Sequence, residues 1–298
     1  PSRMAEVLNR VIEKAHRGSA PAQINVPRDF WTQVIDIELP PIVRFERQGG
    51  GKEAIEKAAK YLSDAKFPVI LSGAGVVIGN AIEETKKLAE KLDSPVCSGY
   101  QHNDSFPGSH PLAVGPLGYN GSKAAMELIS KADVVLALGT RLNPFSTLPG
   151  YGIDYWPKDA KIIQVDMNPD RIGLTKKVSV GISGDAKMVA AQLLEKLSSN
   201  AGDINREERK NIIHQTKSAW LQTLTSLDHE DDDPGTVWNK EARARDKERM
   251  SPRQAWRAIQ AALPEDVIIS SDIGNNCAIG NAYPTFEKGR KYLAPGLF

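Results

Sequence analysis

Hydrophobic residues between positions 52 and 197 follow two alternating spacings. Apolar positions recur three or four residues apart in four segments, which predicts amphipathic helices at residues 54–62, 82–92, 123–130 and 186–197. Short continuous apolar runs separate them, which is typical of buried strands, at residues 68–71, 95–97, 132–138, 161–165 and 178–180. This alternation predicts the α/β fold class, with residues 52–197 as a central domain built on a doubly wound parallel sheet.

The segment before this domain has a different pattern. Residues 4–15 place apolar side chains at helical spacing, and residues 22–27 predict a short strand that ends at Pro27. We assign residues 1–35 to the end of a preceding α/β domain. Residues 36–51 contain two prolines and three glycines in short clusters, which is typical of an extended linker.

The segment after the central domain is rich in charge. Residues 198–250 contain the acidic run 230–233 and then mixed charges, which indicates a solvated helix and a mobile connection. Ser251 and Pro252 predict the start of a new helix, because serine is a favoured N-cap and proline a favoured first helical residue. Residues 267–272 predict a strand. We therefore interpret residues 251–298 as the start of a third domain.

Composition narrows the class of partner. The net charge of +1 provides no field that would gather nucleic acid or an anionic membrane, and no apolar run is long enough to span a bilayer. Cys97 and Cys277 have no metal-ligand spacing and are too few for a disulfide framework. We expect a cytoplasmic protein that acts on small molecules and binds neither nucleic acid nor membrane.

Both ends of the chain have unusual residues for a natural terminus. Pro1 precedes the first methionine, no signal region follows Met4, and the last residues are apolar and follow the turn signal Pro295-Gly296. We expect the chain to be an internal segment of a longer protein.

Candidate chemistry is expected where strands of a parallel sheet end, because ligands bind beyond their carboxyl ends. Gly73 and Gly75 follow the first strand, but Gly79 is one residue too far away for a dinucleotide fingerprint. These glycines either let a phosphate approach the backbone or permit a tight turn. The sequence leaves both interpretations open.

Two further strand ends carry polar side chains. Residues 99–108 include Gln101, His102 and Asn103, and a histidine near Asp104 suggests proton transfer, although turns favour such residues for backbone reasons alone. Arg141 follows the strand at 132–138 and has the geometry to bind an anion with two donors, or else to pair with an acid such as Asp166.

The turn Gly274-Asn275-Asn276 follows the last predicted strand, residues 267–272. Its amides are expected to point into a ligand crevice, or the asparagines cap the next helix instead. Motifs for nucleotide hydrolysis, zinc proteolysis, serine hydrolysis and EF-hand calcium binding are all absent from the sequence.

Several segments resemble the thiamine-diphosphate enzyme superfamily of acetohydroxyacid synthase and pyruvate oxidase. Residues 21–29 resemble the end of its pyrimidine-binding domain. Segments that resemble its central domain are residues 68–75, 106–112 (FPGSHPL), 132–141 (ADVVLALGTR), 162–166 and 184–186. Within this superfamily, residues 29–36, 99–106 and 143–152 are similar to the sulfoacetaldehyde acetyltransferase subfamily.

The resemblance implies three α/β domains per subunit in a homodimer or homotetramer, with thiamine diphosphate and Mg²⁺ held between subunits. It places the activating glutamate before Pro1 and the Gly-Asp-Gly magnesium motif after Phe298, so no catalytic residue or metal ligand is expected in this segment. Gly274, Asn275 and Asn276 match the turn that contacts the diphosphate in relatives.

The same resemblance implies an acyltransferase of taurine and sulfonate metabolism. Its intact form would convert sulfoacetaldehyde and phosphate into acetyl phosphate and sulfite, whereas the segment alone would be inactive. Gln101, His102, Asn103 and Arg141 are the candidates for the substrate funnel. Arg141 matches an arginine that contacts FAD in flavin-containing relatives, so an FAD-containing acetohydroxyacid synthase or oxidase is one alternative. A non-catalytic dinucleotide-binding module is the other.

Overall fold

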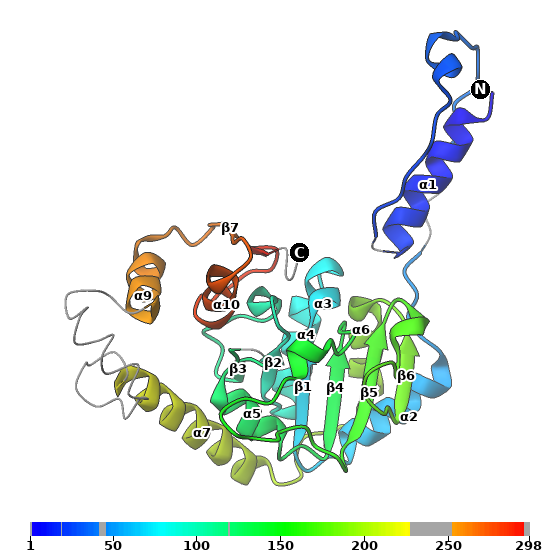
Figure 1. Cartoon of the computed structure of the whole chain (residues 1–298). Coiled ribbons are helices and arrows are strands. Elements are labelled where there is room, and N and C mark those ends of the chain that lie inside the picture. Colours follow the sequence, from blue (N-terminus) through cyan, green and yellow to red (C-terminus); the bar gives the residue numbers. More distant parts are fainter. Residues whose placement is uncertain (1, 19, 42–45, 119, 227–251, 295–298) are drawn as a thin grey trace. The chain divides into compact units, whose positions relative to one another are not determined.

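The computed structural model describes residues 2–18, 20–41, 46–118, 120–226 and 252–294, and the chain divides into two compact units, residues 1–48 and 49–298 (Figure 1). The first unit contains helix α1 (Met4–Gly18) and the 3₁₀ helix η1 (Arg28–Thr32). The strand predicted at residues 22–27 is wrong: no strand forms among the described residues of this unit, so the segment has no neighbour to pair with.

The second unit is built on a six-stranded parallel sheet with the order β3-β2-β1-β4-β5-β6. Its strands, in chain order, are β1 (Pro68–Ser72), β2 (Val96–Ser98), β3 (Ala113–Pro116), β4 (Val134–Leu138), β5 (Lys161–Asp166) and β6 (Val180–Ser183). The direction of winding reverses between the adjacent strands β1 and β4, where Ile70 pairs with Leu136. The predicted doubly wound α/β domain is confirmed, and β1 and β4 meet at its topological switch point.

Helices cover both faces of the sheet and bury every residue of β1 and β4 (Figure 1). One face packs against α2 (Lys52–Ser63), the short α3 (Ala74–Ile78), α4 (Ile82–Leu92) and α6 (Ala186–Lys196). The other face packs against α5 (Lys123–Ile129) and α7 (Arg206–Ser226). Alternate strand residues divide between the two cores, with Ile70 on the first and Leu71 on the second.

Helix α7 departs from the solvated, mobile connection predicted for residues 198–250. Ile213 lies in the second core, and Arg209 is only 1% exposed. The Arg209 guanidinium donates to five backbone carbonyls, those of Lys66, Leu92, Asp93, Gly202 and Ile204. Residues 206–226 are therefore anchored to the central domain, and the acidic run at 230–233 lies outside the described residues.

The last described segment contains α9 (Pro252–Ala262), β7 (Ile269–Ser270), α10 (Asn275–Ala282) and β8 (Tyr292–Leu293). Strands β7 and β8 pair in parallel, with Ile269 opposite Tyr292. The predicted N-cap Ser251 lies outside the described residues, and the strand predicted at 267–272 is shorter than expected. No helix in the described part of the chain is long and apolar enough to cross a membrane.

Candidate functional site

The switch point between β1 and β4 is closed by backbone contacts. The Gly73 amide donates to the Leu138 carbonyl at 3.1 Å, and the Gly75 amide donates to the Gly139 carbonyl at 2.8 Å. A Cβ on Gly75 would lie 2.6 Å from the Gly139 Cα. The glycines thus permit a close approach of two chain segments, which favours the tight-turn interpretation of Gly73 and Gly75 over phosphate binding.

Arg141 stands exposed just beyond this contact, at the end of β4. The alternative partner considered for it, Asp166, is buried and accepts a hydrogen bond from the Asn168 amide at 2.8 Å. No hydrogen bond or ion pair joins Arg141 to any of the described residues. Its five guanidinium donors remain available to an anion.

His102 lies close enough to Arg141 for their charges to interact. Burial is the main cause that lowers the pKa of His102 below its ordinary value, and the positive charge of Arg141 lowers it further, while Asp104 acts in the opposite direction. The His102 side chain is 33% exposed, and its Nδ1 lies 4.0 Å from Asp104 Oδ1. The imidazole is therefore neutral at neutral pH.

Gln101 precedes His102 with a positive φ of 71°, a conformation that non-glycine residues adopt mainly in special turns. Its side-chain Nε2 is buried and has no hydrogen-bond partner among the described residues. The structure therefore brings Gln101, His102 and Arg141 to the same edge of the sheet as candidate polar ligands.

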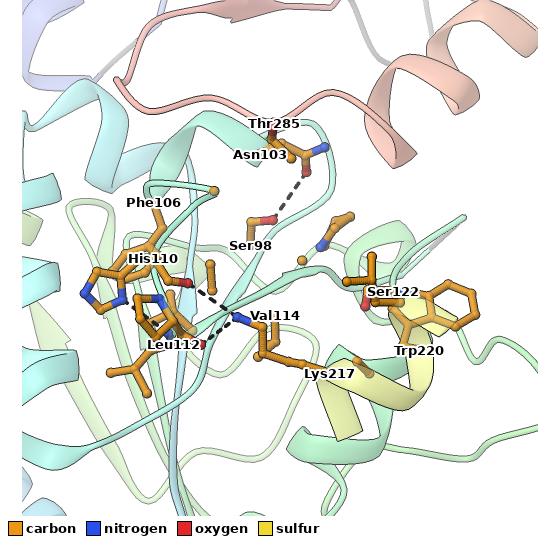
Figure 2. A pocket seen from close by; sticks show the side chains of 18 of the residues that line it. Ser98, Asn103, Phe106, His110, Leu112, Val114, Ser122, Lys217, Trp220 and Thr285 are labelled. Carbon is orange, nitrogen blue, oxygen red and sulfur yellow. Dashed lines mark hydrogen bonds between the residues drawn. The ribbon is translucent and has the colours of Figure 1, made fainter. Parts of the chain in front are cut away.

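Asn103 faces in a different direction from the other funnel candidates. Its amide nitrogen donates to the backbone carbonyls of Asn281 and Pro284 at 2.5 and 3.4 Å. Its side-chain oxygen accepts from the Ser98 hydroxyl (Figure 2). Asn103 thus contacts the last described segment and not the edge at which Arg141 stands.

The turn at residues 274–276 has the geometry of an anion-binding helix start. Gly274 is the N-cap of α10 with a φ of 101°, and no side chain caps the helix. Asn275 and Asn276 occupy its first turn with exposed side chains, and neither makes a hydrogen bond to the described residues. The capping alternative is thus not what the structure shows, and the amides of Asn275 and Asn276 fit a diphosphate oxygen.

Two cavities lie mostly apart from these residues. One of about 1200 Å³ is lined by the edge strand β3, α7 and α9, and includes Phe106, Lys217 and Trp256. Of the predicted funnel residues, it includes Asn103 alone (Figure 2). A smaller cavity of about 390 Å³ between α9 and α10 includes Asn276. Sequence reasoning missed the larger cavity because its walls come from elements far apart in the chain.

Lys217 is a half-buried cation that lines the larger cavity. Its ammonium donates to the Pro111 carbonyl at 2.6 Å, and burial lowers its pKa below the ordinary value. It thus serves to hold α7 against the loop before β3. Within the described residues, no group of three or more histidine, cysteine, aspartate or glutamate side chains is arranged to hold a metal ion.

Comparison with known proteins gives one family model that matches, "Thiamine pyrophosphate enzyme, central domain", over residues 55–193. A probable sulfoacetaldehyde acetyltransferase of Rhizobium meliloti is 78% identical over the whole chain, which covers 50% of that relative. A sulfoacetaldehyde acetyltransferase of Roseovarius nubinhibens is 76% identical, with 49% of it covered. A probable acetolactate synthase large subunit of Methanocaldococcus jannaschii is 38% identical over 76% of this chain. The chain spans about half the length of these two sulfoacetaldehyde acetyltransferase relatives.

Proposed function

Because the chain belongs to the thiamine pyrophosphate enzymes through its central domain, we propose that the full-length protein transfers an acetyl group from sulfoacetaldehyde to phosphate. Its products are acetyl phosphate and sulfite. The observation that carries this proposal is the 78% identity, across the whole chain, to a relative named as such an acetyltransferase. The subfamily resemblance of residues 29–36, 99–106 and 143–152 points the same way.

Thiamine diphosphate, when bound, supplies the electron sink for the aldehyde carbon. The part of this chain that would hold it is the turn at the start of α10. The amides of Asn275 and Asn276 are not used by the helix, and Gly274 permits the positive φ that turns them outward. Both asparagine side chains add donors for phosphate oxygens. The magnesium ion expected beside the diphosphate would take its ligands from residues beyond this chain.

The protein must also recognise a sulfonate and a phosphate, which are both tetrahedral anions. Arg141 suits either, because a planar guanidinium donates two parallel hydrogen bonds to such oxygens. His102 is neutral at neutral pH, so it adds a donor or acceptor without adding charge. Gln101 offers an amide with an unused donor. We propose these three as the funnel residues of the assembled enzyme, which would be a cytoplasmic homodimer or homotetramer.

The test uses the full-length enzyme with thiamine diphosphate, Mg²⁺ and phosphate, and measures sulfite release from sulfoacetaldehyde together with acetyl phosphate. We expect turnover by that enzyme and none by residues 1–298 alone. Acetolactate formation from pyruvate without sulfite release, accompanied by flavin absorbance, would instead identify the FAD-containing alternative. Robust turnover by residues 1–298 would contradict the expectation that the activating glutamate and the magnesium motif lie outside this segment.

A variant at Asn276 tests its proposed contact with the cofactor. Loss of a hydrogen bond to an anionic group costs about 1.5–3 kcal/mol, which corresponds to a roughly 10- to 150-fold weaker affinity. Asn276→Ala should therefore raise the thiamine diphosphate concentration for half-maximal activity at least about tenfold. Asn200→Ala, at another exposed asparagine in the same unit, is the matched control and should leave that concentration unchanged.

A further inference from the structure

Both polar atoms of the Asn103 side chain make hydrogen bonds. Its oxygen accepts from Ser98, the last residue of β2, at 3.3 Å (Figure 2). Its nitrogen donates to the carbonyl of Asn281 at 2.5 Å. Only 9% of Asn103 is exposed. Asn281 lies in the last turn of α10, so one buried carboxamide joins the central sheet to the carboxyl end of that helix.

Asp104, the next residue, contacts the backbone near strand β8 in the same last segment of the chain. It is 2% exposed, and its Oδ2 accepts from the backbone amides of Lys291 and Tyr292 at 3.0 and 3.4 Å. Tyr292 belongs to β8, which pairs with β7. Strand β7 leads directly into the turn at residues 274–276. Asp104 therefore holds β8 and, through its pairing, the strand before the turn, whereas Asn103 holds the helix after it.

Helix α10 depends on such contacts for its direction. An eight-residue helix is not stable by itself in water, and its first turn is exposed to solvent. Its buried residues, Cys277, Ala278, Gly280 and Asn281, belong to neither of the two hydrophobic cores of the sheet. The central domain therefore sets where the amides at its start point.

We infer that Asn103 and Asp104 are positioning residues for the cofactor turn at residues 274–276. They touch neither the cofactor nor the substrate, and they fix the direction in which Asn275 and Asn276 present their donors. This inference rests on the proposed function, because it assumes that the turn binds the diphosphate. A small misplacement of binding groups weakens an interaction strongly, so the effect is expected in cofactor affinity.

The test uses the full-length apo-enzyme with Asn103→Asp, which replaces the donor by an oxygen facing two carbonyls. We expect faster hydrogen–deuterium exchange in residues 275–282 without cofactor, and a roughly tenfold weaker thiamine diphosphate affinity by titration calorimetry. Ser109→Ala is the matched control. Ser109 also joins the central domain to the last described segment, through exposed hydrogen bonds to Glu287, and this variant should change neither the exchange rate nor the cofactor affinity.

Variants at Asp104 provide a second route if Asn103→Asp does not fold. Asp104→Ala should reproduce both effects, and Asp104→Asn should largely restore the wild-type values, because an amide oxygen still accepts from the two backbone amides. Unchanged exchange and affinity in a folded variant would overturn the inference, as would lower thermal stability with unchanged affinity. If the wild-type enzyme binds no thiamine diphosphate, the proposed function fails, whereas the exchange experiment still tests whether Asn103 and Asp104 hold α10.

Discussion

The buried guanidinium of Arg209 donates hydrogen bonds to several backbone carbonyls, and Arg209→Met tests how much these bonds contribute to stability. The substitution keeps an unbranched apolar stem and removes the donors to five backbone carbonyls. Hydrogen bonds from a charged donor contribute about 1.5–3 kcal/mol each, but they are not additive around one group. Burial lowers the pKa of Arg209, so part of their energy offsets the desolvation of its charge. The substitution leaves buried carbonyls without a donor, at about 1–3 kcal/mol for each unsatisfied group before relaxation, so we expect a total loss of about 3–5 kcal/mol.

The assay is thermal and urea unfolding of this chain. For a domain of this size, about 2–4 °C per kcal/mol predicts a Tm lowered by roughly 6–20 °C. Arg206→Met is the matched control on the same helix: Arg206 is partly exposed and pairs with Asp93 at 2.6 Å, so its loss should cost about 0–1 kcal/mol. Hydrogen–deuterium exchange should report loosening of α7 in the first variant only. A loss below about 1 kcal/mol for Arg209→Met, or equal losses for both variants, would refute the reasoning.

Three further predictions concern the central domain. Because burial lowers the pKa of His102, the unfolded chain binds a proton there that the folded chain does not, so stability falls as the pH drops below about 6.5. His102→Gln should remove this part of the pH dependence in unfolding measured between about pH 5 and 8. Gly75→Ala would place a Cβ 2.6 Å from the Gly139 Cα, and a shift of the urea midpoint should show a loss of about 1–3 kcal/mol. Ser122→Ala removes the hydroxyl that accepts from the Ala125 amide at the start of α5, and calorimetry should show a loss of about 1 kcal/mol.

The parts of the fold that were predictable from the sequence are those determined by local pattern. Strand β4 is wholly apolar, β1 is apolar up to its last residue Ser72, and both lie in the middle of the sheet, so their runs are unambiguous. Strand β3 was missed because it ends in Gly115 and Pro116, residues that weaken a strand signal, and because it lies at the sheet edge, where only alternate residues are buried.

The parts that were not predictable depend on partners distant in sequence. Arg209 lies in a charged stretch whose pattern predicts exposure to solvent. It is buried because its guanidinium bonds to backbone carbonyls, one of them 143 residues away in the sequence. Asn103 bonds to a carbonyl 178 residues away, so its neighbours in the sequence carry no sign of that role. Candidate positions could be predicted because strand ends are visible in the sequence, whereas the direction of each side chain could not.

The backbone contact between Gly75 and Gly139 also bears on how this sheet edge can change during evolution. In many doubly wound folds, main-chain amides at the switch point bind the ligand, so its recognition is tied to the fold. Here the amides of Gly73 and Gly75 already donate to carbonyls at the end of β4 and in the loop after it. Recognition of an anion at this edge therefore falls to exposed side chains such as Arg141. A lineage can exchange such a residue, and with it the preferred anion, while the glycines and the strand order stay unchanged.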